Sequence, residues 1–223
     1  MASRAAGLLS RSSYASRLVI MAKYPVAGRV KQRLARGIGD VAATRFYRST
    51  LAHTVLSLGA DPRWRTYLAV SPDTTVDAPC WPSSGNVARI LQGAGDLGAR
   101  MQSLFDGLPP GPVVIVGSDI PAIRPAHIIR AFKLLASSDA VFGPALDGGY
   151  WLVGLKRSPR RLAPFAGVAW STENTLAATL ANLRGRAIAF APTLSDVDTK
   201  EDYRREGTSG ERLVPRTARR SGP

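Results

Sequence analysis

One carboxylate of this chain, Asp119, stands at a position suited to chemistry. It follows the apolar run Val113–Gly117, which predicts a buried strand, and it precedes Pro121 in a loop. In an open α/β sheet, ligands bind outside the carboxyl ends of the strands. An acid at such a strand end is placed to bind a ligand rather than to pack in the core. We therefore expect Asp119 to be a catalytic residue.

Further acids could join Asp119 in holding a hard divalent cation, Mg²⁺ or Mn²⁺. Asp147 precedes two glycines, and Asp198 lies in the acid-rich segment Asp196–Asp202. Carboxylates that converge at strand ends can hold such an ion, which bridges phosphate oxygens and steadies a diphosphate leaving group. Two simpler interpretations remain open. Asp198 and Thr199 could cap the last helix, with Asp202 three residues further on, and Asp147 could belong to a turn.

A basic loop follows the first predicted strand. It runs from residue 23 to residue 33, and its cations and one glycine could wrap a polyphosphate, because glycine permits close backbone approach and Arg binds phosphate bidentately. A solvated basic loop is the alternative. The residues expected to bind nucleotide here are Lys23, Gly28, Arg29, Lys31 and Arg33, with Ser118 beside Asp119.

A second glycine-rich segment, Gly93–Gly98, matches the dinucleotide-binding fingerprint, and Asp119 lies about 20 residues beyond it, as that motif requires. A Rossmann fingerprint normally occupies the first β-α turn, however, and this segment follows the third predicted strand. We therefore favour a different interpretation, in which Gln92, Asp96 and Arg100 line a pocket beside the nucleotide and the glycines allow a tight turn.

The sequence offers no clear general base. Asp147 and Glu173 are the candidates. The two histidines, His53 and His127, fall on predicted helices without a partnering acid or serine, which indicates surface or packing positions. The segment Trp170–Thr172 ends a loop and opens a helix, so its hydroxyls could cap that helix or contact a substrate.

Strands that alternate with helices must position these residues. We expect a mostly parallel sheet covered on both faces, in a single domain over residues 18–203. The apolar runs predict strands at 18–22, 64–70, 87–91, 113–117, 139–143, 150–155 and 187–191. Helices are expected from Asp40 as N-cap, at 97–107, from Pro125, and at 172–183.

Half of the formal net charge of +14 lies outside this domain. Residues 1–17 and 204–223 are expected to be disordered basic tails, and residues 18–203 retain only +7. That charge suits phosphate-bearing ligands, and no basic block interleaved with aromatics favours a specific nucleic-acid partner. The first segment has the composition of a transit peptide, but we favour a disordered tail, or a start wrongly placed upstream of Met21, over that interpretation.

The location and assembly of the protein have weaker signals. A single cysteine, Cys80, excludes an intrachain disulfide and fits a reducing compartment, so we expect a cytoplasmic protein. No apolar run approaches the roughly 20 residues that span a bilayer. The sequence carries no signal for an oligomeric state.

Six ordered motifs resemble those of one bacterial family, once called domain of unknown function 2064. Its members are classed as glycosyltransferases and are associated by gene context with arsenosugar biosynthesis. The resemblance covers roughly residues 18–203 and extends to the nucleotide-diphospho-sugar transferase superfamily. It implies a GT-A-like fold, a three-layer α/β/α sandwich with a mostly parallel sheet. The motifs are Lys23–Lys31, Gly95–Met101, Gly117–Pro121, Gly143–Tyr150, Trp170–Thr172 and Asp196–Thr199.

The resemblance also implies roles for individual residues. Asp119 would be the principal metal ligand, Asp198 would complete the metal site, and the basic loop would hold nucleotide phosphates. Gln32 departs from the family, which usually has Thr before Arg-Leu, and this puts the fine positioning of the phosphate loop in doubt. The residues that would face the acceptor are Gly148, Gly149, Tyr150, Trp170, Ser171 and Thr172.

The sequence thus predicts a metal-dependent transferase that uses a nucleotide-activated donor, with sugar transfer to a small acceptor as the first hypothesis. Fold alone does not fix the reaction. A nucleotidyltransferase that joins an NTP to a small phosphorylated acceptor is the alternative, and it would release pyrophosphate rather than a nucleoside diphosphate. A non-catalytic nucleotide-binding module would bind the donor without consuming it.

Overall fold

The apolar runs of the sequence form the strands of one sheet. A computed structural model describes residues 15–85, 87–157 and 161–210. Within these residues the sheet has seven strands in the order β3-β2-β1-β4-β6-β5-β7. The strands are β1 (Arg17–Lys23), β2 (Arg65–Ser71), β3 (Ala88–Leu91), β4 (Val113–Gly117), β5 (Ala140–Pro144), β6 (Tyr150–Leu155) and β7 (Ile188–Phe190).

All of these strands run parallel except β6, which pairs antiparallel with both β4 and β5. The expected mostly parallel sheet is therefore confirmed. The carboxyl ends of β1 and β4 lie side by side, with Met21 opposite Gly117. This register brings the basic loop after β1 next to the Asp119 loop after β4.

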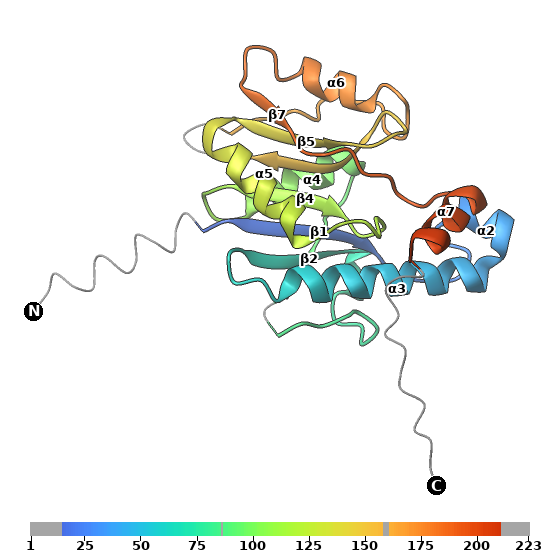
Figure 1. Ribbon diagram of the computed structural model, residues 1–223. Coiled ribbons are helices and arrows are strands. Elements are labelled where there is room, and N and C mark those ends of the chain that lie inside the picture. Colours follow the sequence, from blue (N-terminus) through green and yellow to red (C-terminus); the bar gives the residue numbers. More distant parts are fainter. Residues whose placement is uncertain (1–14, 86, 158–160, 211–223) are drawn as a thin grey trace, which may run out of the picture.

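Helices cover both faces of the sheet (Figure 1). The long helix α3 (Asp40–Gly59) and α5 (Pro125–Ser137) cover one face, and α4 (Leu97–Gly107) and α6 (Thr175–Ala181) cover the other. Two further helices, α2 (Gln32–Ile38) and α7 (Lys200–Gly210), lie together beyond the strand ends. A short 3₁₀ turn, η1 (Asp73–Thr75), follows β2.

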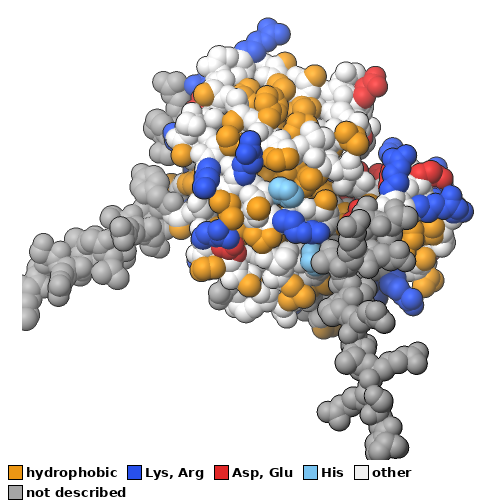
Figure 2. Space-filling model, viewed as in Figure 1, with side chains coloured by type: hydrophobic (Ala, Val, Ile, Leu, Met, Phe, Trp, Pro, Cys, Tyr) orange, Lys and Arg blue, Asp and Glu red, His pale blue; other side chains and the backbone are white. Residues whose placement is uncertain are grey.

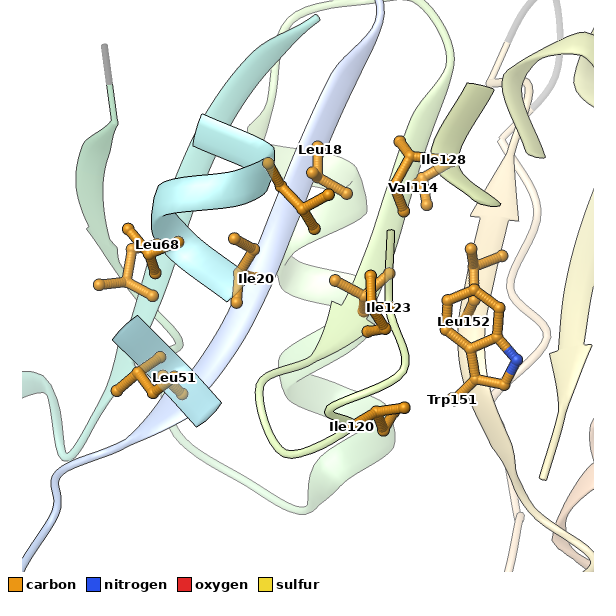
Figure 3. Packing of buried hydrophobic residues seen from close by; sticks show 14 of the residues in the cluster. Leu18, Ile20, Leu51, Leu68, Val114, Ile120, Ile123, Ile128, Trp151 and Leu152 are labelled. Carbon is orange, nitrogen blue, oxygen red and sulfur yellow. The ribbon is translucent and has the colours of Figure 1, made fainter. Parts of the chain in front are cut away.

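The core on the α3 and α5 side fixes the loop after β4 (Figure 3). Alternate residues of β1, such as Leu18 and Ile20, pack there against Leu51 of α3. In the loop after β4, the side chains of Ile120 and Ile123 point back into the same core and are almost completely buried. Burying a large aliphatic side chain stabilises a fold by roughly 1.5–3 kcal/mol, so this loop is firmly anchored.

The expected elements are found, with differences at their boundaries. Gly39, with φ of 86°, precedes α3 as its N-cap, so the expectation that Asp40 is the N-cap was wrong: Asp40 is the first helical residue. The helix expected at 172–183 begins only at Thr175. Residues 32 and 33, which we assigned to the basic loop, open the unpredicted helix α2.

Regular structure extends slightly beyond the expected domain limits. β1 begins at Arg17, whose side chain is buried and donates to the carbonyl oxygens of Ala15 and Pro110, and α7 ends at Gly210. The remainder of the two expected tails lies outside the described residues. Among the helices that are described, none is long and apolar enough to cross a membrane.

Candidate functional site

A cleft of about 780 Å³ opens where the carboxyl ends of β1, β2 and β4 meet α2. It collects residues that are far apart in the sequence. Of the predicted site residues, the cleft is lined by Lys23, Arg29, Lys31, Arg33, Gln92, Arg100, Ser118, Asp119, Asp147, Tyr150, Ser171, Thr172 and Asp198. The remaining predicted residues, Gly28, Asp96, Gly148, Gly149 and Trp170, do not line it.

Asp119 is held between two anchored neighbours. Ser118 is buried, and its hydroxyl lies 3.1 Å from the hydroxyl of Tyr47 on α3. The Tyr47 hydroxyl also accepts from the backbone N–H of Lys23 at 2.8 Å. Ile120 on the other side is fixed in the core. The carboxylate of Asp119 therefore reaches the cleft from a backbone that is tied to both β1 and α3.

A small satellite core places the other acids. Val197 is buried against Leu34 of α2 and Ala43 of α3. Its neighbours Asp196 and Asp198 remain partly exposed and approach Asp119. Because Leu34 lies one turn after Lys31, the same contact also brings the Lys31 side chain to these acids.

Lys31 stands at the centre of this acidic cluster. Its Nζ atom lies 2.8 Å from Asp119 Oδ2, 2.6 Å from Asp198 Oδ1 and 3.4 Å from Asp196 Oδ2. The lysine side chain is only 4% exposed, whereas the three carboxylates are 33–37% exposed. The backbone of Lys31 is left-handed, with φ of 48° and ψ of 46°, an uncommon conformation for a residue other than glycine.

The charges of the cluster shift the pKa values of its members. Burial lowers the pKa of Lys31, but the negative charges of Asp119 and Asp198 outweigh burial and hold this pKa above its usual value. Burial, together with the neighbouring acids Asp198 and Asp119 and against the charge of Lys31, raises the pKa of Asp196 to about 6. The lysine is therefore protonated at neutral pH.

The three acids fit a divalent cation. Each offers one carboxylate oxygen, and these oxygens lie within 4.8 Å of one another. Hard oxygen donors of this kind are the ligands that Mg²⁺ and Mn²⁺ prefer. Asp196 was absent from our predicted metal ligands, although the alternation acid, valine, acid carried the signal: in an extended segment, residues 196 and 198 share a face when 197 is buried.

The capping alternative for the last helix holds for Thr199 and Asp202 and not for Asp198. Asp202 accepts from the Thr199 backbone N–H at 2.9 Å, and its own N–H donates to the Thr199 hydroxyl at 3.2 Å. This reciprocal pair is a capping box at the start of α7. It leaves Asp198 to the cleft.

Cations also line the cleft. Figure 2 shows Lys and Arg side chains close to acidic ones around the end of the molecule that α2 and α7 form. Lys23, Arg29 and Arg33 are exposed at the cleft, and Arg33 reaches only within 3.7 Å of Asp198. Gln32, the departure from the family pattern, donates to the Gly28 carbonyl oxygen at 2.9 Å and so closes the basic loop on itself.

Gln92 is buried behind Arg100 and links that side chain to the sheet by hydrogen bonds. Its buried amide donates to the carbonyl oxygens of Ala22 on β1, at 3.0 Å, and Ala69 on β2, at 2.8 Å. Its Oε1 atom accepts from Arg100 Nη1 at 2.9 Å. Because this uses both N–H groups and the oxygen, the structure favours a positioning role for Gln92 over the direct nucleotide contact that we expected.

The Gly93–Gly98 turn serves α4. Asp96, expected to contact nucleotide, is the N-cap of that helix and accepts from the Ala99 N–H at 2.8 Å. Gly98 makes room for Trp170, since a Cβ atom there would lie 2.5 Å from the indole. Trp170 therefore covers α4 and Phe165 and does not line the cleft, contrary to its expected acceptor-facing position. The turn follows β3, at the edge of the sheet.

A glycine-rich turn forms the remaining wall. Asp147 Oδ1 accepts from the Gly149 N–H at 2.9 Å, so the expected turn is present, and the carboxylate still lines the cleft. Gly148 packs against the backbone of Glu173, which brings the two candidate bases, Asp147 and Glu173, to one wall. Burial raises the pKa of Tyr150 beside them to about 12, so its phenol is neutral at neutral pH.

Tyr47 was missed as a site residue. Its spacing on α3 indicated only a core position, and the structure adds that its hydroxyl connects Lys23 with Ser118. A tyrosine at the same helical spacing as Leu51 and Val55 was the available signal, because a buried phenol needs a hydrogen-bond partner.

Comparisons with known proteins agree with this architecture. A family model described as "Uncharacterized protein conserved in bacteria (DUF2064)" matches residues 54–172. Among proteins of curated function, none matches the chain. A solved structure from Desulfovibrio desulfuricans G20, described as a "putative nucleotide-diphospho-sugar transferase", is 26% identical, with a TM-score of 0.80 and coverage of 92% of both chains.

More distant structures share the fold alone. The 4-diphosphocytidyl-2C-methyl-D-erythritol synthase of Anaerococcus prevotii DSM 20548 is 10% identical, with a TM-score of 0.58 over 88% of this chain and 98% of the other. Rv0371c of Mycobacterium tuberculosis H37Rv, in complex with manganese, is 17% identical, with a TM-score of 0.50 over 86% and 97%. The sheet and its helices thus form the GT-A-like fold of nucleotide-diphospho-sugar transferases.

Proposed function

The chain belongs to the family of proteins conserved in bacteria called DUF2064, and we propose that it is a metal-dependent transferase that uses a nucleotide-activated donor. Sugar transfer from a nucleotide sugar to a small acceptor is the reaction that we favour. The similarity over 92% of both chains to a protein described as a "putative nucleotide-diphospho-sugar transferase" supports this choice. One exposed cysteine, Cys80, suits a reducing compartment such as the cytoplasm.

One observation carries the proposal: Asp119, Asp196 and Asp198 converge beside a cleft that is rich in cations. Acids that could hold a divalent ion and basic groups that could hold phosphates together suit a nucleoside diphosphate bound with a metal ion. A cleft of about 780 Å³ is within the range of small-molecule and cofactor sites.

The residues of the chain would divide the work by charge. Lys23, Arg29, Arg33 and Arg100 would bind the donor phosphates, with Arg100 oriented by the buried amide of Gln92. The three carboxylates would hold the divalent cation, which when bound supplies positive charge to a departing diphosphate. Catalysis would rest mainly on positioning and on this charge stabilisation.

The acceptor would enter along the wall that carries Asp147 and Glu173. Both side chains are exposed at the cleft and could accept a proton from an acceptor hydroxyl. Ser171 and Thr172 line the same wall and offer hydroxyls for orientation. We propose Asp147 as the residue that orients the acceptor, because the Gly149 N–H fixes its carboxylate.

Nucleotidyl transfer is the second candidate. The cations at the cleft outnumber what a diphosphate needs, and a nucleoside triphosphate would make fuller use of Lys23, Arg29, Arg33 and Arg100. Sugar transfer consumes a nucleotide sugar and releases a nucleoside diphosphate, whereas nucleotidyl transfer consumes an NTP and releases pyrophosphate.

Thermal shift of the full chain with Mn²⁺ against a panel of NTPs, nucleoside diphosphates, nucleotide sugars and NAD tests the donor class, because a ligand of the native state raises its melting temperature. We expect stabilisation by one nucleotide sugar and its diphosphate, only with metal. Preference for an NTP with pyrophosphate release would support the second candidate. Response to NAD alone would refute both.

Asp119→Asn provides the test of the site. We expect this variant to fold and to lose metal-dependent stabilisation by the nucleotide sugar, because the metal loses one anionic ligand and the fold loses no buried apolar contact. Asp77→Asn is the matched control, since Asp77 is an exposed acid outside the cleft. Unchanged metal dependence in Asp119→Asn would overturn the site assignment.

A further inference from the structure

Lys31 fills the space that a divalent cation would need. Its ammonium lies 2.6–3.4 Å from one oxygen of each of the three acids. An ion bound to those oxygens would have to occupy the volume that Nζ fills, and two cations so close together repel each other strongly. The protein therefore holds a cation of its own, covalently attached, at the centre of the acidic cluster.

The lysine also has an alternative partner within reach. Lys31 belongs to the basic loop that lines the cleft, between the exposed side chains of Arg29 and Arg33. A four-carbon stem with rotatable bonds lets the ammonium move while the backbone stays in place. Donor phosphates bound by this loop would replace the carboxylates as anionic partners of the ammonium.

The geometry points to an exchange: a divalent cation binds the cluster of Asp119, Asp196 and Asp198 only by displacing the Lys31 ammonium, which then contacts the donor phosphates. This inference rests on the proposed function of the same cleft. It makes metal and donor binding cooperative, because phosphates stabilise the lysine position that leaves the carboxylates open. Thermodynamic linkage requires the donor to bind more tightly with metal by the same factor.

Mn²⁺ titrations of the full chain, followed by the electron paramagnetic resonance of free Mn²⁺, test the competition with the metal alone as probe. Lys31→Met removes the internal cation at similar side-chain length. We expect this variant to bind Mn²⁺ about tenfold more tightly than the wild type, a factor typical of coupled sites. Equal or weaker binding by a folded Lys31→Met variant would overturn the exchange.

Arg33→Met is the matched control for charge alone. Arg33 also lies near the cluster, 3.7 Å from Asp198, but its side chain is 70% exposed and does not fill the space among the three acids. Solvent screens such a charge, so we expect the Mn²⁺ affinity to change by less than about threefold. If Arg33→Met gained as much Mn²⁺ affinity as Lys31→Met, the loss of any nearby positive charge would explain both results. The proposed displacement of Lys31 would then be wrong.

Acetylation of the unmodified protein gives a readout that needs no variant. In the absence of metal, the buried and ion-paired Lys31 amine should react slowly with an amine-acetylating reagent, as measured by peptide mass spectrometry. Saturating Mn²⁺ should raise its rate severalfold, and subsequent addition of UDP, GDP or CDP should protect it again in the case of the diphosphate that binds. Lys133, exposed on α5, is the control amine, whose rate should stay constant.

The outcomes separate the two proposals. Suppose that Mn²⁺ binds the wild type but not Asp119→Asn, and that Lys31 stays protected from acetylation when Mn²⁺ is bound. The metal site then stands and the exchange is wrong. If Lys31 is released by Mn²⁺ but no diphosphate protects it again, the phosphate partner is wrong. If Mn²⁺ binds neither the wild type nor Lys31→Met, the proposed metal site itself fails, and the exchange fails with it.

Discussion

Single residues show how closely the chemistry of this cleft depends on local conformation. Lys31 adopts a left-handed backbone, and three carboxylates fix its ammonium. Gly148, which follows the cleft residue Asp147, has φ of 83° and packs against the backbone of Glu173. Neither conformation follows from the identity of the residue alone, and each brings charged groups to the cleft.

Gly148→Ala should destabilise the protein by about 3 kcal/mol or more, because it adds backbone strain and an overpacked contact. A Cβ atom at this position would lie 2.0 Å from the Glu173 carbonyl oxygen. Gly167→Ala is the matched control, since Gly167 has φ of 67° and no atom within 4 Å of a Cβ. The control should lose only about 1 kcal/mol. Urea unfolding measures both, and equal losses would contradict the close contact.

Elements of secondary structure are joined at the cleft by a few buried polar side chains. Gln92 connects β1, β2 and, through Arg100, α4. Tyr47 of α3 connects the ends of β1 and β4. Such contacts fix the loops that follow the strands, because a buried polar group that loses its hydrogen-bond partner destabilises the fold.

Gln92→Leu should lower the free energy of unfolding by about 2 kcal/mol, because two backbone carbonyls lose the donors of the buried amide. It should also weaken donor binding by releasing Arg100. Arg100→Ala separates the two effects: we expect weaker donor binding with a stability change below about 0.5 kcal/mol. Denaturant unfolding and thermal shift with the donor provide the measurements. An unchanged free energy of unfolding in Gln92→Leu would contradict the structural role of the buried amide.

The start of α5 contains a titrating cap. His127 Nδ1 accepts from the Arg124 N–H at 3.2 Å, and burial, with a smaller contribution from the Arg124 charge, lowers the pKa of His127 below 6.5. The unfolded chain therefore binds this proton more strongly, and stability is lost as the pH falls below 6.5.

His127→Gln keeps an acceptor at the same helix position and removes the titration. We expect the melting temperature of the wild type to fall more than that of the variant between about pH 7.5 and about pH 5.5. The comparison cancels the other titrating groups, and parallel curves would show that His127 contributes nothing to the acid sensitivity.

The whole molecule combines a basic surface with a cleft in which both signs of charge meet. The formal net charge of +14 includes two Arg in residues 1–14 and four Arg against Glu211 in residues 211–223. The sheet, the hydrophobic clusters on its two faces and the cleft lie within residues 15–210.

A chain trimmed to residues 15–210 should therefore keep its melting temperature and its metal-dependent response to the donor, and it should bind nucleic acid less. Nucleic-acid binding by the full chain should fall steeply with salt, because it arises from phosphate neutralisation by the terminal Arg residues. Filter binding at two salt concentrations, beside thermal shift, measures both properties. Retained salt-insensitive nucleic-acid binding after trimming would instead indicate a specific nucleic-acid site in the domain.

The sequence alone determined the elements and their order. Apolar runs such as Val113–Gly117 and the helical spacing of Tyr47, Leu51 and Val55 specify strands and helices locally, because burial on one or both faces imposes a period. The sequence also pointed to Asp119, a carboxylate directly after a buried strand, and the structure places this residue at the cleft. Short α2 was missed because its seven residues carry too little periodicity and begin inside a basic motif.

Only the tertiary structure decided which charged groups meet. Asp198 lies 167 positions from Lys31 in the sequence, and the contact forms because Val197 packs on Leu34 and Ala43. Three other residues looked equally suited to binding but have structural contacts instead. Asp96 caps a helix, the Gln92 amide bonds to backbone carbonyls of the sheet, and Trp170 packs on Phe165. A local sequence pattern reflects the burial and periodicity of hydrophobic residues. The partner of a polar side chain depends instead on which distant segments fold against it, and a local pattern does not contain that information.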